Sequence, residues 1–231
     1  MSVSLDTVGR HHMRTDNIEI VAQQLSDIFD INVLIEYFDG DKFIETGRVV
    51  KHEDRPFHRL EDYSGEDYPV EYELDAACGD DEIEKNHFFY MQIYREMINI
   101  CIHGWPYKAI HYESCFFEDE PVRKEVKEWM RVFRLTCKEV FGKLGVNKIF
   151  CFGGGYDNLT HLDDEAMNMS GEDYEEYVLS GKCAVDAEKR TGENECKYYT
   201  VVNVSDFISG KSRTYAKGYM DVFIDDFADL T

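Results

Sequence analysis

The residues best suited to hold a cation lie close together, between positions 157 and 165. Carboxylates combined with one imidazole suit Mg²⁺, Mn²⁺ or Ca²⁺, and a bound metal could activate water, as in a metal-dependent hydrolase. An EF-hand spacing fails, because Leu159 stands where an oxygen ligand belongs. A dense acidic loop is also typical of a solvated surface, so the sequence leaves both interpretations open. The candidate metal ligands are Asp157, His161, Asp163, Asp164 and Glu165.

A second set of candidates combines carboxylates with tyrosines, which suits the binding of a basic protein. Residues 53–84 hold thirteen Asp or Glu against two Arg, and residues 156–177 hold acidic residues but no Lys or Arg. Aromatic anchors within charged surroundings are common at the centres of protein interfaces. The residues predicted to contact such a partner are Asp62, Tyr63, Asp67, Tyr68, Glu172, Asp173, Tyr174 and Tyr177.

Two other patterns resemble catalytic sites but lack essential residues. The glycines at 153–155 follow a predicted strand, as in phosphate-binding loops, yet the acidic residues that follow would repel an anion. Cys151 precedes them, but Asp157 stands where a cysteine phosphatase needs an arginine. We therefore expect a turn or a bulge and a core cysteine here, and no cofactor other than the metal ions named above.

The overall charge limits the partners that the protein can meet. The chain has 47 Asp and Glu against 25 Lys and Arg, a formal net charge of −22. Nucleic acid and anionic membranes are repelled by such a charge, whereas basic proteins and cations are attracted. We expect a basic protein partner, no nucleic acid and no membrane; the sequence leaves the oligomeric state open.

The cysteines and the N-terminal residues indicate the compartment. Seven cysteines are scattered along the chain without a C-x-x-C spacing, which favours reduced thiols. The first sixteen residues lack the apolar block of a secretory signal. We therefore expect the protein in the cytoplasm.

The first third of the chain shows the clearest periodicity. Residues 16–29 predict a helix with apolar residues on one face, and Asp16 with Glu19 predicts a capping box at its start. Residues 31–38 and 42–50 predict two strands of a hairpin, joined at Asp39 and Gly40.

Later elements are predicted from shorter patterns. Residues 81–103 predict a buried helix, with a long buried strand as the alternative, because apolar residues occupy every side. Residues 121–144 predict an amphipathic helix with seven basic residues on its polar faces. Ser170 is expected to cap a helix over 172–179. Outside its predicted strand, 53–84 is expected to be loop. The remaining predicted strands are 70–74, 109–117, 146–152, 198–204 and 219–224.

These elements predict an α+β fold, with a mainly antiparallel sheet covered by two or three helices. Residues 16–231 are expected to form a single domain, and any internal boundary is expected within 153–170. Residues 1–15 are left as an N-terminal segment that can be disordered.

The candidate sites favour a binding or inhibitor-type protein over an enzyme. Such a protein would engage a basic partner through its carboxylate-rich loops, and complex formation would depend strongly on salt. One alternative is a metal-dependent, hydrolase-like enzyme that uses the acidic cluster at 157–165. The other is a structural α+β domain with no ligand.

Overall fold

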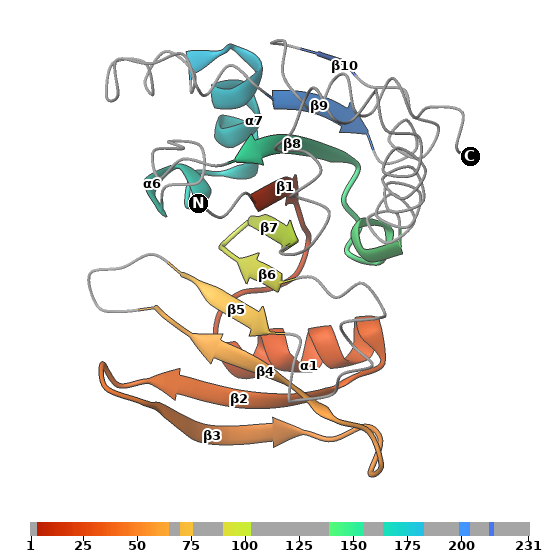
Figure 1. Cartoon of the computed structure of the whole chain (residues 1–231), viewed down its shortest axis with the longest axis vertical. Coiled ribbons are helices and arrows are strands. Elements are labelled where there is room, and N and C mark those ends of the chain that lie inside the picture. Colours follow the sequence, from red (N-terminus) through yellow and green to blue (C-terminus); the bar gives the residue numbers. More distant parts are fainter. Residues whose placement is uncertain are drawn as a thin grey trace, which may run out of the picture.

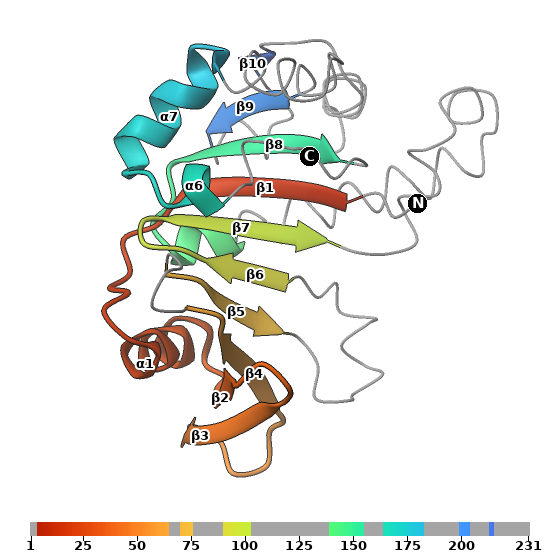
Figure 2. The same cartoon turned by 90° about the vertical axis from the view of Figure 1, so that its left-hand side faces the viewer.

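A single mixed β-sheet dominates the structure, a computed structural model that describes residues 4–64, 70–75, 90–102, 139–154, 164–182, 199–203 and 213–214. The described strands form a ten-stranded sheet in the order β10-β9-β8-β1-β7-β6-β5-β4-β2-β3 (Figures 1 and 2). Neighbouring described strands run antiparallel, except that β2 pairs with β4 in parallel. Together with the helices, this sheet confirms an α+β fold.

The elements have the following bounds. The strands are β1 (Ser4–Arg10), β2 (Asn32–Phe38), β3 (Phe43–Val49), β4 (Phe57–Asp62), β5 (Tyr72–Asp75), β6 (Tyr90–Ile93), β7 (Met97–Ile102), β8 (Lys148–Gly154), β9 (Tyr199–Asn203) and β10 (Arg213–Thr214). The helices are α1 (Ile18–Phe29), α6 (Asp164–Met167) and α7 (Gly171–Leu179), and residues 139–143 are also helical. None of the described helices is long and apolar enough to cross a membrane.

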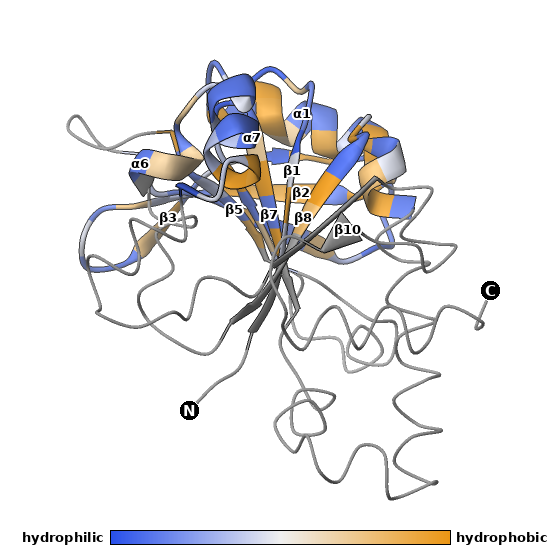
Figure 3. Ribbon diagram, turned by 90° about the horizontal axis from the view of Figure 1, so that it is seen from above, coloured by the Kyte–Doolittle hydropathy of each residue, from blue (hydrophilic) through white to orange (hydrophobic). Residues whose placement is uncertain are grey.

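Helix α1 forms where the sequence predicts it, because its apolar residues recur on one face. Val21 and Leu25 are fully buried and pack in the larger core cluster, with Val33 of β2 and Leu60 of β4. Both α1 and α7 carry hydrophobic and hydrophilic residues, as helices on the surface of a sheet do (Figure 3). Figures 1 and 2 show α1 beside β2, β4 and β5, and α7 beside β8 and β9.

The two core clusters lie on opposite faces of the sheet. The larger one includes Ile149 of β8 together with α1, and the smaller one includes Phe150 of β8 together with α6 and α7. Successive side chains of a strand point to opposite faces. The sheet therefore buries one face with α1 and residues 140–146, and part of the other face with α6 and α7.

The predicted helix over 81–103 is wrong for residues 90–102, which form the β6–β7 hairpin; residues 81–89 lie outside the described residues. The Tyr94 N–H donates to the Met97 carbonyl at 2.9 Å and closes the turn. Both faces of this hairpin carry buried apolar residues, so the sequence lacks the simple alternation that marks a half-buried strand.

Three other expectations also need correction. Residues 57–62, expected as loop, form β4, and residues 4–10 of the supposed disordered segment form β1 between β7 and β8. Gly153 and Gly154 belong to β8 and pair with β1 in an unbroken register, so they form neither the predicted turn nor a bulge. Short strands of mixed polarity are stabilised by pairing with distant strands, which local pattern does not reveal. The predicted strands at 109–117 and 219–224, and most of the predicted helix at 121–144, lie outside the described residues.

Candidate functional site

Four glutamates lie side by side across four neighbouring strands. The register pairs Glu45 of β3 with Glu36 of β2, and Glu36 in turn with Glu61 of β4. Glu61 then pairs with Glu73 of β5. Residues paired directly across strands point to the same face. We call Glu45, Glu36, Glu61 and Glu73 the carboxylate row, and the side of the sheet that holds it, opposite α1, the carboxylate face.

The carboxylate row runs from the surface into the interior. Glu45 is exposed and Glu36 is half-buried, whereas Glu61 is 6 % and Glu73 is 9 % exposed. Among the described residues, the Glu36 Oε2 atom is buried and makes no hydrogen bond. Like charges directly opposite each other destabilise a sheet. Four like charges next to one another are therefore a natural place to look for function.

At its exposed end, the carboxylate row is partly balanced by an arginine. Arg48 donates from Nε and Nη2 to the two carboxylate oxygens of Glu45, at 2.7 and 2.9 Å. These hydrogen bonds hold the pKa of Glu45 below its usual value. Arg48 also lies over the Phe57 ring, 5.4 Å from its centroid. The exposed end therefore combines both charges with an aromatic ring.

An aromatic cluster lies next to the carboxylate row, on the same face. It consists of Phe38, Phe43 and Tyr63, whose ring centroids are 5.0 to 6.1 Å apart. Each of the three side chains remains 37 % exposed. Large aromatic side chains of this kind are typical anchors of protein interfaces.

Tyr63 connects the aromatic cluster with the carboxylate row. Its hydroxyl donates to the Glu61 Oε2 atom at 2.8 Å. Burial, this hydrogen bond and the nearby carboxylates of Glu73 and Glu71 raise the pKa of Tyr63 well above its usual value. The phenol therefore stays protonated and acts as a donor to the carboxylate row at physiological pH.

The predicted contact residues of the first acidic stretch separate in the structure. Tyr63 belongs to the aromatic cluster, as just described. Asp62 is next to it in sequence and lies on the opposite face, where its Oδ1 atom accepts the Ser64 N–H at 2.8 Å. Asp67 and Tyr68 lie outside the described residues.

The predicted contact residues on α7 also differ in exposure. Glu172 and Asp173 are exposed in the first turn, where Ser170 caps the helix as predicted. Tyr174 is fully buried and Tyr177 is 8 % exposed, and both belong to the smaller core cluster. Their prediction as partner anchors is wrong, because the helical spacing of three turns both rings toward the sheet.

The predicted metal ligands fall largely outside the described part of the chain. Asp157, His161 and Asp163 are not described, while Asp164 begins α6 and Glu165 is exposed on it. Within the described residues, no group of three or more His, Cys, Asp or Glu is arranged to hold a metal ion. The metal site at 157–165 therefore stays a prediction.

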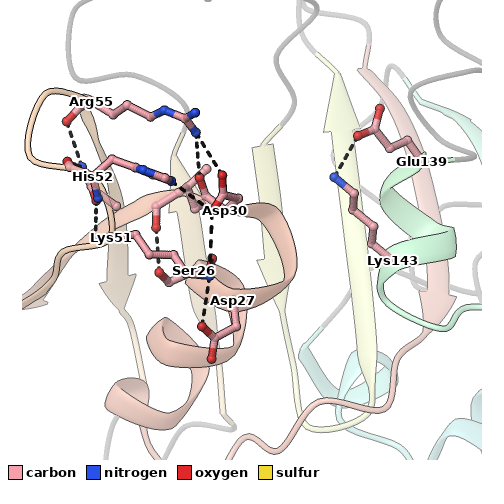
Figure 4. A network of polar contacts seen from close by, with 10 residues as sticks. Ser26, Asp27, Asp30, Lys51, His52, Arg55, Glu139 and Lys143 are labelled. Carbon is pink, nitrogen blue, oxygen red and sulfur yellow. Dashed lines mark hydrogen bonds and ion pairs between the residues drawn. The ribbon is translucent and has the colours of Figure 1, made fainter.

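A second polar network holds the end of α1 against the loop between β3 and β4 (Figure 4). The Asp30 carboxylate lies 3.0 Å from His52 Nε2 and 3.2 Å from Arg55 Nη1. Lys51 Nζ lies 3.1 Å from Asp27 Oδ1 and also donates to the Ser26 carbonyl. The contact with His52 is the main cause that lowers the pKa of Asp30. Because these groups contact one another, we assign this network a structural role.

The carboxylate row itself was missed by reasoning from the sequence. The signal that could have found it is the alternation of Glu71 and Glu73 with apolar residues, which predicts one polar face on β5. Comparison with known proteins adds no further guide: no family model, curated protein or solved structure matches the chain.

Proposed function

We propose that this protein binds a basic protein partner through the exposed end of its carboxylate face. The observation that carries the proposal is the contact between the exposed aromatic cluster and the carboxylate row, through Tyr63 and Glu61. Binding energy in protein interfaces is concentrated in a few aromatic anchors, and complementary charge around them directs the encounter. In this proposal Phe38 and Phe43 provide the anchors and Glu36 and Glu45 the charge.

The net charge supports a basic partner over other classes. A molecule with a formal charge of −22 repels the phosphates of nucleic acid and attracts Lys- and Arg-rich surfaces. Association with a basic protein would be accelerated by this field and slowed by salt. Glu172 and Asp173 would add to the field without forming the contact.

The proposal treats the chain as one α+β domain that includes β1, because β1 pairs with both β7 and β8. It places this domain in the cytoplasm, where the seven cysteines stay reduced. Its contact surface is the sheet face, in place of the carboxylate-rich loops expected from the sequence.

Affinity capture from a lysate of the native cell tests this proposal. The bait is used as wild type, as the double variant Phe38→Ser/Phe43→Ser and as the control Val50→Ser, which changes an exposed apolar residue outside the aromatic cluster. We expect a basic protein that is held at low salt by wild type and control, released at high salt and lost by the double variant. Equal capture by all three baits would contradict the proposed surface. Absence of any specific protein would favour a structural domain with no ligand.

A further inference from the structure

Strand β3 forms one edge of the described sheet, and its side chains are exposed on both faces. It is the last strand in the sheet order and pairs with β2 alone among the described strands (Figure 2). Phe43 and Glu45 are exposed on the carboxylate face, and Ile44 is exposed on the other. Proteins usually protect such an edge, since its free N–H and C=O groups can pair with another chain.

The hairpin register shows which backbone groups of β3 point away from β2. The Asp39 N–H donates to the Lys42 carbonyl at 3.2 Å, which makes these two residues a hydrogen-bonded pair. Hydrogen-bonded and non-hydrogen-bonded pairs alternate along antiparallel strands. Phe43 and Glu45 are therefore at non-hydrogen-bonded positions, and their N–H and C=O groups point to the free edge.

We propose that the basic partner adds an extended segment to the edge of β3, between Lys42 and Glu45. This inference rests on the proposed function and specifies how the partner is held. Main-chain hydrogen bonds to Phe43 and Glu45 would provide affinity, and alternate side chains would provide specificity. A basic residue of the segment lies opposite Glu45 and pairs with the exposed end of the carboxylate row. An apolar residue two positions away packs on Phe43.

Charge and register both favour this occupant over a second copy of the chain. Two copies joined at β3 would bring two carboxylate rows together, and each copy carries a formal charge of −22. A basic segment instead brings positive charge beside the exposed carboxylate of Glu45, next to the half-buried Glu36. The register shift beside Thr46 interrupts the edge after Glu45. This bulge limits the added segment to a short strand.

A synthetic peptide with alternating basic and apolar residues tests strand addition on the full chain. The probe is acetyl-Thr-Lys-Thr-Phe-Thr-Lys-Thr-amide, measured at low salt by calorimetry. Two methylated forms serve as a matched pair, one with N-methyl groups on the Phe amide and the second Lys amide, and one with N-methyl groups on the two inner Thr amides. Whether the peptide runs parallel or antiparallel to β3, only one of these two sets of backbone amides points toward β3. We expect one form to bind at least tenfold more weakly than the other.

A pair of protein variants tests the same hydrogen bonds from the other side. Glu45→Gln removes the charge and keeps the N–H at the free edge, whereas Glu45→Pro removes both. Strand addition predicts that the proline variant binds the peptide at least tenfold more weakly than the glutamine variant. If the proline variant does not fold, the methylated pair decides.

Equal binding of both methylated forms, or no peptide binding at all, would overturn strand addition. The proposed function would survive that result if the aromatic variants still abolished capture of the basic partner. A dimer of the free protein that Glu45→Pro dissolves would identify a second copy as the occupant and would also overturn the inference. Each of these results overturns strand addition alone, because the proposed function is tested separately by capture with the aromatic variants.

Discussion

His11 is buried beside the turn between β6 and β7, and its two hydrogen bonds fix a neutral ring. Its Nδ1 atom accepts the Met13 N–H at 3.1 Å, so Nε2 carries the proton and donates to the Tyr94 carbonyl at 2.9 Å. Burial is the main cause that lowers the pKa of His11 below its ordinary value of 6.5. The folded protein therefore resists protonation at this position.

This residue predicts a pH dependence of folding. Above pH 6.5 the stabilisation is fully present; as the pH falls below 6.5, the unfolded state takes up a proton that the folded state does not, and stability decreases. His11→Leu should lower the free energy of unfolding by about 1–3 kcal/mol at pH 8, because two buried polar groups lose their partner. The difference from wild type should narrow toward pH 5. Urea unfolding between pH 8 and pH 5 measures the free energy of unfolding of both proteins. If the two free energies change in parallel with pH, the neutral, buried His11 is not the cause.

Asn17 caps helix α1, whereas its neighbour Asp16, which the sequence predicts as the cap, does not. Asn17 Oδ1 accepts the Ile20 N–H at 2.9 Å, whereas Asp16, the predicted cap, pairs with Arg14 on the surface. Asn17→Ala should therefore cost about 1 kcal/mol of stability. Asp16→Ala should cost clearly less, since exposed ion pairs contribute little. Thermal unfolding of the two variants compares them directly, and a larger loss for Asp16→Ala would contradict the cap.

At the scale of elements, the start of α7 is positioned by a contact between a glycine and an arginine. Gly171 is buried at the first position of α7, and its N–H donates to the Glu96 carboxylate, which also pairs with Arg10 of β1. A Cβ atom at Gly171 would collide with Cδ and Nε of Arg10. The contact explains why this helix begins with glycine.

Two glycine substitutions test that contact against helix propensity. Gly171→Ala should destabilise the protein by roughly 1–3 kcal/mol, because the displaced Arg10 strains a packed site. Gly142→Ala is the matched control, since a Cβ atom there meets nothing within 4 Å. In a helix it should be neutral or stabilising by up to about 1 kcal/mol. Equal effects in chemical denaturation would remove Arg10 from the explanation.

The carboxylate row predicts a conflict between stability and binding. Glu36→Gln removes the charge between Glu45 and Glu61 and should raise the free energy of unfolding by about 0.5 kcal/mol at low salt. The same change should weaken binding of the basic partner, because it removes charge from the contact surface. Glu53→Gln removes an equal charge from an exposed loop position and should change neither quantity appreciably. If Glu36→Gln is stabilised and still binds the basic partner with full affinity, the carboxylate row is not part of the binding surface.

Local pattern predicted the elements that carry an apolar stripe, a helix cap or a hairpin turn. The helix at 16–29, the hairpin strands at 31–38 and 42–50, and the Ser170 cap are confirmed by α1, β2, β3 and α7. Residues 90–102 were predicted wrongly because the hairpin buries apolar residues on both faces of the sheet, such as Ile98 on one and Met97 on the other. The carboxylate row could not be predicted, since its members are up to 37 positions apart, from Glu36 to Glu73, and meet through strand register alone. Glu61 of β4 connects Glu36 with Glu73, and the sequence of β4 has no pattern strong enough to predict a strand.

At the scale of the whole molecule, charge and sheet topology act together. The formal charge of −22 attracts basic proteins to many parts of the surface, with a range of about 10 Å at 0.1 M salt. The sheet order exposes β3 at one edge and therefore presents the aromatic cluster and the outer carboxylates at one place. In this account, the field brings the partner near and the β3 edge decides where it docks.

Hydrogen exchange of the full chain, alone and in complex with the captured basic protein, tests this claim most directly. The account predicts slower exchange on binding over residues 36–45 and 57–63, with little change over α1 and α7. Protection of 43–45 relative to the free protein would also agree with strand addition at the β3 edge. Protection confined to α7 or to the end of α1 would contradict the account, because it would place the partner away from both the carboxylate row and the aromatic cluster.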